Sequence, residues 1–247
     1  MSKMAIYGIH PVEEALRRAS DLVEEVVVAG SLEEKQFATI QKRVRQAGVA
    51  VHKASGQELD RLADGGNHQR VAAVVSSYPY LSLQDVLDDD TDQSYRCVVA
   101  LAQVQDPGNL GAILRSCAAL GVDAVLIPKH RSAQMTPAVV RASAGMAFDV
   151  PMVRVTNLAR ALRTLKEHRF WIVGTVAEDA QPMWEMDWEL NAVIVMGGEH
   201  QGMRPGVEKE CDFRLSVPLH KGVESLNVAA ATAITLYDRR RSLATKG

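Results

Sequence analysis

The C-terminal half of the chain contains three short segments rich in glycine, proline or asparagine, and each follows an apolar run of strand length. They lie at residues 106–115, 197–202 and 217–228. Such residues after a buried strand leave polar groups and open backbone at the strand's carboxyl end, where open α/β sheets bind ligands. We therefore expect the three segments, which are distant in the sequence, to meet in one pocket.

The composition is that of a globular protein. The 247 residues are 47% apolar, which suits one large or two small domains with a proper core. No apolar run approaches the roughly 20 residues of a membrane span, and the start lacks the apolar stretch of a secretory signal. The three cysteines are far apart and form no C-x-x-C pair, so we expect a reducing cytoplasm. The seven histidines lack ligand spacing, so no metal site is expected.

The acidity of the chain is concentrated in one place. The net charge is only −2, but residues 81–94 contain five aspartates and neither lysine nor arginine. Together with Pro79, this run of like charges predicts a linker over 79–94. It would separate an N-terminal domain, residues 1–78, from a C-terminal domain, residues 95–247. An acidic surface loop within one domain is the alternative.

Both parts alternate between helical and strand patterns. The N-terminal part predicts helices at 11–18, 32–46 and 57–62 and strands at 24–28, 49–51 and 71–75. The C-terminal part predicts strands at 98–102, 124–127, 152–155, 171–176, 192–196 and 213–217 and helices at 110–119, 138–142, 158–168 and 227–241. The C-terminal strands are apolar without strict alternation, which is typical of a parallel sheet covered on both faces. The fold class is therefore α/β, with a small N-terminal α/β domain and a C-terminal α/β domain whose sheet is mostly parallel.

The first segment contains a candidate helix start. We expect Asn109 to be the N-cap of the following helix, after a turn at 106–108. Arg115 comes nearly two turns later, on a somewhat rotated face. A strand-turn-helix joint with a surface arginine would give the same pattern. The G-x-G-x-x-G fingerprint is absent, so an ordinary dinucleotide-binding loop is not supported.

The other two segments offer open backbone and polar side chains. Gly197 and Gly198 let backbone approach a ligand closely, and Glu199 follows at the strand end. Ser225 and Asn227 are expected to cap the last helix. Taken singly, a glycine-rich turn with a solvated glutamate and a plain helix cap are equally simple interpretations.

In order and spacing, the three segments resemble the motifs of the SpoU/TrmH family of RNA 2′-O-ribose methyltransferases. Residues 7–16 and 68–73 also resemble that family's substrate-binding domain, so the resemblance covers nearly the full chain. Within the family, the chain is most similar to bacterial enzymes that methylate a guanosine in 23S rRNA.

This resemblance implies a fold, a cofactor and partners. It implies a deep trefoil knot in the C-terminal domain, S-adenosylmethionine as cofactor and a homodimer with the active site at the subunit boundary. The RNA partner would be 23S rRNA or a ribosome-assembly intermediate, bound by the N-terminal domain in the cytoplasm without any membrane. The residues implied to bind the cofactor are Gly197, Gly198, Val217, Leu219, Leu226 and Asn227.

The resemblance also implies the catalytic set Asn109, Arg115, Glu199, Ser225 and Asn227. Family accounts favour the arginine as the group that activates the ribose hydroxyl. A guanidinium holds its proton at neutral pH, so we interpret Arg115 as a phosphate clamp and a stabiliser of the developing alkoxide. Glu199 is then an alternative base or the group that orients Arg115. Asn109, Ser225 and Asn227 would fix the ribose and the loops.

Three positions depart from the family pattern: Arg70, where glycine is frequent, Gly108, where histidine is frequent, and Ala229, where serine is common. None of them belongs to the implied catalytic set, so they bear on which nucleotide is methylated more than on catalysis. A tRNA ribose methyltransferase of the same family and a catalytically silent RNA-binding ribosome-assembly protein remain as alternatives. A nucleotide-dependent oxidoreductase is disfavoured by the missing glycine fingerprint.

Overall fold

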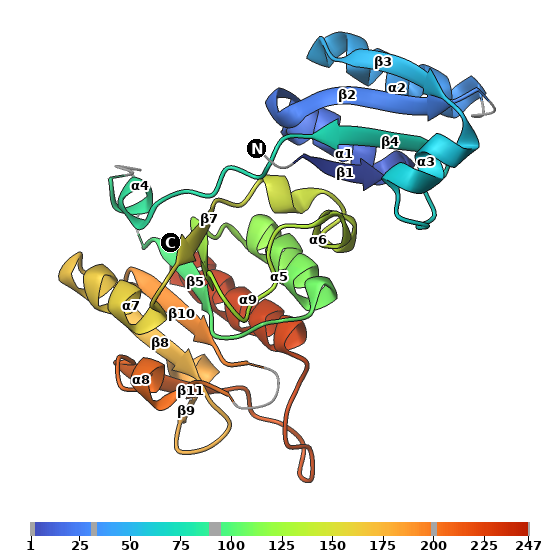
Figure 1. The fold of residues 1–247 in the computed structure, drawn as a ribbon. Helices are drawn as coiled ribbons and strands as arrows, with labels where there is room; N and C mark the ends of the chain where they lie inside the picture. The colour runs from blue at the N-terminus through green and yellow to red at the C-terminus, as the bar shows by residue number, and fades with distance from the viewer. Residues whose placement is uncertain (1–2, 31–33, 89–94, 199–201, 247) are drawn as a thin grey trace. The chain divides into compact units, whose positions relative to one another are not determined.

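The structure is a computed structural model, drawn as a ribbon in Figure 1. It describes residues 3–30, 34–88, 95–198 and 202–246. The chain divides into two compact units. Unit 1 combines Met1–Pro79 with Met135–Asp149, and unit 2 combines Tyr80–Gln134 with Val150–Gly247. A segment from the C-terminal half therefore belongs to the unit of the N-terminal residues.

Unit 1 has a four-stranded sheet in the order β1-β4-β2-β3. Its strands are β1 (Met4–Tyr7), β2 (Val23–Ala29), β3 (Ala50–Ala54) and β4 (Val71–Val75). Its N-terminal helices are α1 (Ile9–Arg18), the 3₁₀ turn η1 (Ser20–Leu22), α2 (Glu34–Ala47) and α3 (Gly56–Leu62). Val26 and Val28 pack with α1 and α2, whereas Val27 and Ala29 pack with Leu59 of α3. Strand β2 is thus buried on both faces, because successive side chains point to opposite sides.

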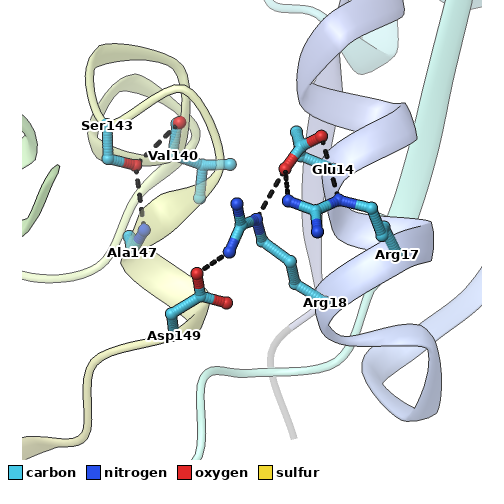
Figure 2. Close-up of polar contacts among 7 residues, drawn as sticks. All are labelled: Glu14, Arg17, Arg18, Val140, Ser143, Ala147 and Asp149. Atoms are coloured by element: carbon cyan, nitrogen blue, oxygen red, sulfur yellow. Dashed lines mark hydrogen bonds and ion pairs between the residues drawn. The ribbon is translucent and has the colours of Figure 1, made fainter. Parts of the chain in front are cut away.

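The segment from the C-terminal half that completes unit 1 forms α6 (Pro137–Ala142) and the 3₁₀ turn η2 (Met146–Phe148). Val140 is fully buried in the same cluster as the apolar faces of α1 and α2. Figure 2 shows the buried Ser143 Oγ donating to the Val140 carbonyl at 2.9 Å and accepting from the Ala147 amide at 3.2 Å. A Cβ added at Gly145, where φ is +79°, would lie 2.3 Å from the Cβ of Glu14. This turn therefore needs glycine both for its backbone angle and for its contact with α1.

Ion pairs join the same segment to α1. Glu14 accepts from Arg17 Nη2 at 2.6 Å and from Arg18 Nε at 2.5 Å, and Arg18 also pairs with Asp149 (Figure 2). These contacts lower the pKa of Glu14 to about 2, chiefly through the hydrogen bond from Arg17, against an opposing effect of burial. The Glu14 side chain is 16% exposed, so water screens these contacts less than those of a surface pair.

The lowered pKa of Glu14 makes a prediction about acid stability. A carboxylate with a depressed pKa stabilises the fold above its ordinary value of 4.5, and this contribution is lost as pH falls toward 2. We expect Glu14→Gln to lower the free energy of unfolding at pH 7 by about 1–3 kcal/mol. The difference from the unmodified protein should narrow at pH 3, as measured by urea unfolding followed by circular dichroism. Glu13→Gln is the matched control, and a Glu14→Gln effect that is independent of pH would contradict the prediction.

Unit 2 has a seven-stranded sheet in the order β7-β6-β5-β10-β8-β11-β9, and all of its recorded strand pairs are parallel. Its strands are β5 (Cys97–Leu101), β6 (Ala124–Pro128), β7 (Met152–Val155), β8 (Trp171–Thr175), β9 (Gln181–Pro182), β10 (Ala192–Met196) and β11 (Phe213–Ser216). Every residue of β5 and β10 is buried. Central strands buried throughout require cover on both faces of the sheet.

Helices provide that cover. They are α4 (Leu83–Leu87), α5 (Pro107–Leu120), α7 (Leu158–Glu167), α8 (Pro205–Glu208) and α9 (Val228–Lys246), with the 3₁₀ turn η3 (Met183–Glu185). One core cluster joins residues of α4, α7 and α8 to side chains of the central strands. Helices α5 and α9 pack against each other, and Figure 1 shows them on the other side of the sheet from α7.

A buried polar contact anchors α9. Trp188 is fully buried, and its Nε1 donates to Asp238 Oδ2 at 3.1 Å. Arg241 donates to the other oxygen of Asp238 at 2.9 Å. A buried indole N–H without a partner is costly, so this pair favours one position of α9 along its axis.

The predicted α/β class and the mostly parallel C-terminal sheet are confirmed. Strand β1 was not predicted, and α4 lies within the segment predicted as a linker. A Ser82–Asp85 capping box begins α4, and Val86 is buried in the core. The boundaries 1–78, 79–94 and 95–247 stay a prediction. Among the described helices, none combines the length and apolarity needed to cross a bilayer.

Candidate active site

Two of the three segments meet at the carboxyl ends of β5 and β10. These strands pair in parallel with Leu101 opposite Met196, and the Ala102 amide donates to the Met196 carbonyl at 2.9 Å. A Cβ at Gly198 would lie 2.8 Å from the Ala102 carbonyl oxygen and 3.2 Å from Gln103 Cβ. The loops after β5 and β10 are therefore in direct contact, and only glycine fits at position 198.

The loop after β10 folds back on itself. The Gly198 amide donates to the Gly202 carbonyl at 2.9 Å, and a Cβ at Gly197 would lie 3.1 Å from the Gly202 backbone. The predicted catalytic residue Glu199 lies in the part of this loop that is outside the described residues. The described ends of this loop, Gly198 and Gly202, are thus joined to each other, and Gly198 lies against the loop after β5.

The helix after β5 begins earlier than the sequence predicts. The prediction that Asn109 is the N-cap of α5 is wrong: the cap is Asp106, whose Oδ1 accepts from the Asn109 amide at 2.7 Å. Pro107 takes the first helical position, where its missing N–H costs nothing. Because Asp106 caps the helix, the Asn109 side chain is available for another contact.

That contact is with the third segment. Asn227 caps α9, as predicted, and its Oδ1 accepts from the Ala229 amide at 2.9 Å and the Ala230 amide at 3.4 Å. The cap fixes the orientation of the carboxamide, so Nδ2 points away from α9 and donates to Asn109 Oδ1 at 2.9 Å. A side-chain hydrogen bond thus joins the first turn of α5 to the start of α9.

The remaining predicted residues lie close in the chain to these contacts. Arg115 is exposed on α5 and forms no ion pair with any residue that the structure describes. Ser225 is exposed, and none of the described hydrogen bonds involves it. Leu226, beside Asn227, is 38% exposed.

The predicted cofactor residues after β11 lie two strands from those after β10. Strands β10 and β11 both pair with β8, on its two sides, so their carboxyl ends are about 10 Å apart. Val217 and Leu219, which follow β11, are partly buried. Gly197 and Gly198 follow β10. The two groups of residues flank the end of β8 at one edge of the sheet.

Sequence reasoning missed one pair at this edge. Gln103 has φ of +71°, in the left-handed region that non-glycine residues rarely adopt. With its carboxamide oxygen turned toward Arg204, it accepts from Nε at 3.1 Å and from Nη2 at 2.6 Å. The pair joins the loop after β5 to the residue before α8. No sequence signal marks a positive φ at glutamine, although Gln103 does follow a strand directly.

The surroundings of the three thiols of unit 2 disfavour the thiolate form. Burial raises the pKa of Cys97 and of Cys211 to about 11 and raises that of Cys117 further above its ordinary value. A cysteine nucleophile must be a thiolate, so none of the three suits covalent catalysis at neutral pH. In the described parts of the chain, no three histidine, cysteine or acidic side chains gather as metal ligands would.

The Asn109–Asn227 contact can be tested by a double-mutant cycle. Asn109→Ala removes the hydrogen bond but leaves the cap of α9, whereas Asn227→Ala also removes that cap and should cost about 1–3 kcal/mol. We expect the double variant to be at most about 0.5 kcal/mol less stable than the single variant Asn227→Ala. The hydrogen bond is already lost in that single variant, so it cannot be lost a second time. Thermal unfolding measures these differences. Asn157 caps α7 in the same way, so Asn157→Ala should be additive with Asn109→Ala; additivity of the Asn109 and Asn227 changes would contradict the contact.

Comparison with known proteins agrees with this geometry. The SpoU rRNA Methylase family matches residues 96–237, and the family of RNA 2'-O ribose methyltransferase substrate-binding domains matches residues 5–81. The chain is 39% identical over 244 residues to the 23S rRNA (guanosine-2'-O-)-methyltransferase RlmB of Escherichia coli K12, covering 98% of this chain and all of that protein. It is 37% identical to the enzyme of the same name from Vibrio parahaemolyticus, over the full length of both.

A solved structure has the same fold. The SpoU methyltransferase AviRb from Streptomyces viridochromogenes, crystallised with AdoMet, superposes with a TM-score of 0.80 at 22% identity, covering 98% of this chain and 91% of that one. The chain belongs to the SpoU rRNA methylase family.

Proposed function

We propose that the protein transfers a methyl group from S-adenosylmethionine to the 2′-hydroxyl of a guanosine ribose in 23S rRNA. The observation that carries this proposal is the hydrogen bond between Asn227 and Asn109, which lies on the helix that follows the loop packed against Gly198. It brings together two of the polar residues that the resemblance implies for catalysis. The full-length relatives named as 23S rRNA guanosine methyltransferases support the choice of substrate.

The residues at the sheet edge fit S-adenosylmethionine. Leu226 and Val223 are 38% and 49% exposed, and a Cβ at Gly222 would meet nothing within 4 Å. Exposed apolar side chains beside open space suit an adenine ring. Gly197, Gly198, Val217, Leu219, Leu226 and Asn227 are the residues we propose to hold it. When bound, it supplies an electrophilic methyl group on a positively charged sulfur, which leaves as a neutral thioether.

The protein's own residues position and activate the ribose. Arg115 stays protonated, since its guanidinium has a pKa above about 12. We propose that it clamps a backbone phosphate of the RNA and stabilises the negative charge that develops on the 2′-oxygen. Glu199 accepts the hydroxyl proton or orients Arg115. Asn109, Ser225 and Asn227 hold the ribose and the loops, and such positioning can supply roughly 7–11 kcal/mol of the barrier.

The variant Arg115→Lys tests whether catalysis needs the planar guanidinium or only its positive charge. Lysine keeps the positive charge but loses the planar fork, so we expect single-turnover methylation of a 23S rRNA transcript to fall by about 100-fold or more. Tritiated methyl transfer measures the rate, and calorimetry should show unchanged binding of S-adenosylmethionine, tighter than about 1 mM. Arg160→Lys, an exposed arginine of α7, is the control. A near-normal rate in Arg115→Lys would show that the fork is dispensable, and methylation of tRNA but not 23S rRNA would reassign the substrate.

We also propose that the chain forms a homodimer, with the active site at the subunit boundary and with a trefoil knot where the C-terminal residues thread a loop. Ile234 and Tyr237 of α9 are 40% and 62% exposed and lie three residues apart on one helix face. Large apolar side chains gathered on a helix surface suit a protein interface. The helix carrying them follows Asn227 directly, so a partner there would lie close to the site. Because its RNA is ribosomal, we place the protein in the cytoplasm.

The dimer makes its own prediction. Tyr237→Glu puts a charge into the proposed interface. In size-exclusion chromatography with light scattering, the unmodified protein should elute as a dimer and the variant as a monomer. Methyl transfer should fall with the dimer fraction. Val51→Glu, at an exposed apolar position of β3 that is 37% exposed, should remain dimeric and active. A fully active monomer would contradict the proposal.

A further inference from the structure

Unit 1 carries an exposed arginine stacked on a tyrosine. Arg141 of α6 donates from Nη1 to the Tyr7 hydroxyl at 2.8 Å, and its Cζ lies 5.3 Å from the centre of the Tyr7 ring. Both residues belong to the same compact unit, although 134 positions separate them in the sequence. Planar guanidinium and aromatic groups together form a surface of the kind on which nucleic-acid bases stack.

Both side chains lie next to tightly packed residues of unit 1. Val140, next to Arg141, is fully buried in the core of unit 1. Tyr7 ends β1, and a Cβ at Gly66 would lie 2.4 Å from the Tyr7 hydroxyl, so the loop before β4 packs directly on the phenol. Little rearrangement is therefore needed before a ligand binds, which lowers the entropy cost of binding.

The charge of Arg141 is not neutralised by a neighbour. Arg17 and Arg18 of the same unit pair with Glu14 and Asp149 (Figure 2). By contrast, Arg141 forms no ion pair with any residue in the described part of the chain, and its side chain is exposed. An arginine that contacts only an aromatic ring retains its full attraction for a phosphate.

A second exposed arginine, Arg70, comes directly before β4. Tyr7 pairs with Ala72 of that strand in antiparallel register, two residues after Arg70. Arg70 has φ of +67°, and its amide donates to His68 Nδ1 at 2.9 Å. Glycine would adopt this backbone angle without strain. An exposed arginine held there in spite of the strain is consistent with a function for its side chain.

We propose that Tyr7, Arg70 and Arg141 form the surface on which unit 1 binds an unpaired nucleotide of the RNA. The base stacks on the Tyr7–Arg141 pair, and a neighbouring phosphate contacts an arginine. This inference rests on the proposed function for its ligand, RNA, but not on methyl transfer. It assigns an RNA contact to a residue between β6 and β7, in the part of the sequence that matches the methylase family.

The test is RNA affinity, measured by fluorescence anisotropy with a labelled single-stranded oligouridylate and with a 23S rRNA transcript. We expect Arg141→Ala and Tyr7→Leu each to weaken binding by roughly 5- to 100-fold. Tyr7→Phe keeps the ring and should bind nearly as the unmodified protein does. Arg141→Ala should also reduce the slope of log affinity against log salt concentration by about 1 if Arg141 contacts a phosphate.

Arg45→Ala is the matched control. Arg45 is an exposed arginine of the same unit, on the helix that leads into β3, the edge strand opposite β1. The RNA affinity of the Arg45→Ala variant should lie within about twofold of that of the unmodified protein. Binding of S-adenosylmethionine should be unchanged in all variants. If Tyr7→Leu lowers the melting temperature, Arg141→Ala decides the question, because an exposed side chain can be truncated without loss of core packing.

Unchanged affinity of Arg141→Ala for both RNAs would overturn the inference, even if the protein methylates 23S rRNA normally. Weakened RNA binding by this variant, in a protein that transfers no methyl group, would uphold the inference and reject the proposed function. The two ideas therefore fail separately.

Discussion

The parallel direction of the strands in unit 2 is the constraint on which the candidate site depends. Strands β5, β10, β8 and β11 lie side by side and all run the same way, so their carboxyl ends share one edge of the sheet. The loops after β5 and β10 then approach so closely that only glycine fits at position 198. A polar site forms at this edge because the buried sheet leaves its connecting loops free to carry function.

Helix α9 supplies the third segment of the candidate site. Its packing on α5 brings Asn227 within hydrogen-bonding distance of Asn109. The buried Trp188–Asp238 contact fixes the far part of the same helix. The catalytic geometry that we propose thus depends on the position of a helix whose own sequence shows only a cap and a run of small residues.

Unit 1 shows how similar residues take different roles according to their partners. Arg17 and Arg18 are bound to carboxylates, and the pair of Arg18 with Asp149 joins α1 to the segment 135–149. Arg141, from that same segment, faces solvent on an aromatic ring. Ion pairs keep the segment in place, and its remaining charge is available to a ligand. Composition alone, with a net charge of −2, gives no sign of such a surface.

The sequence by itself determined the α/β class, most strands of both sheets and the Asn227 cap, because apolar periodicity and cap residues act locally. The meeting of Asn109 with Asn227 was expected only from the shared edge of a parallel sheet, and the packing of α9 on α5 decides it. The cap of α5 was misplaced by three residues, since Asp106 and Asn109 are both good cap residues. Only the tertiary structure decided that 135–149 joins unit 1, that Gln103 adopts a positive φ and that Tyr7 meets Arg141. These features depend on contacts between residues far apart in the chain. Local sequence patterns do not specify which distant side chains come into contact.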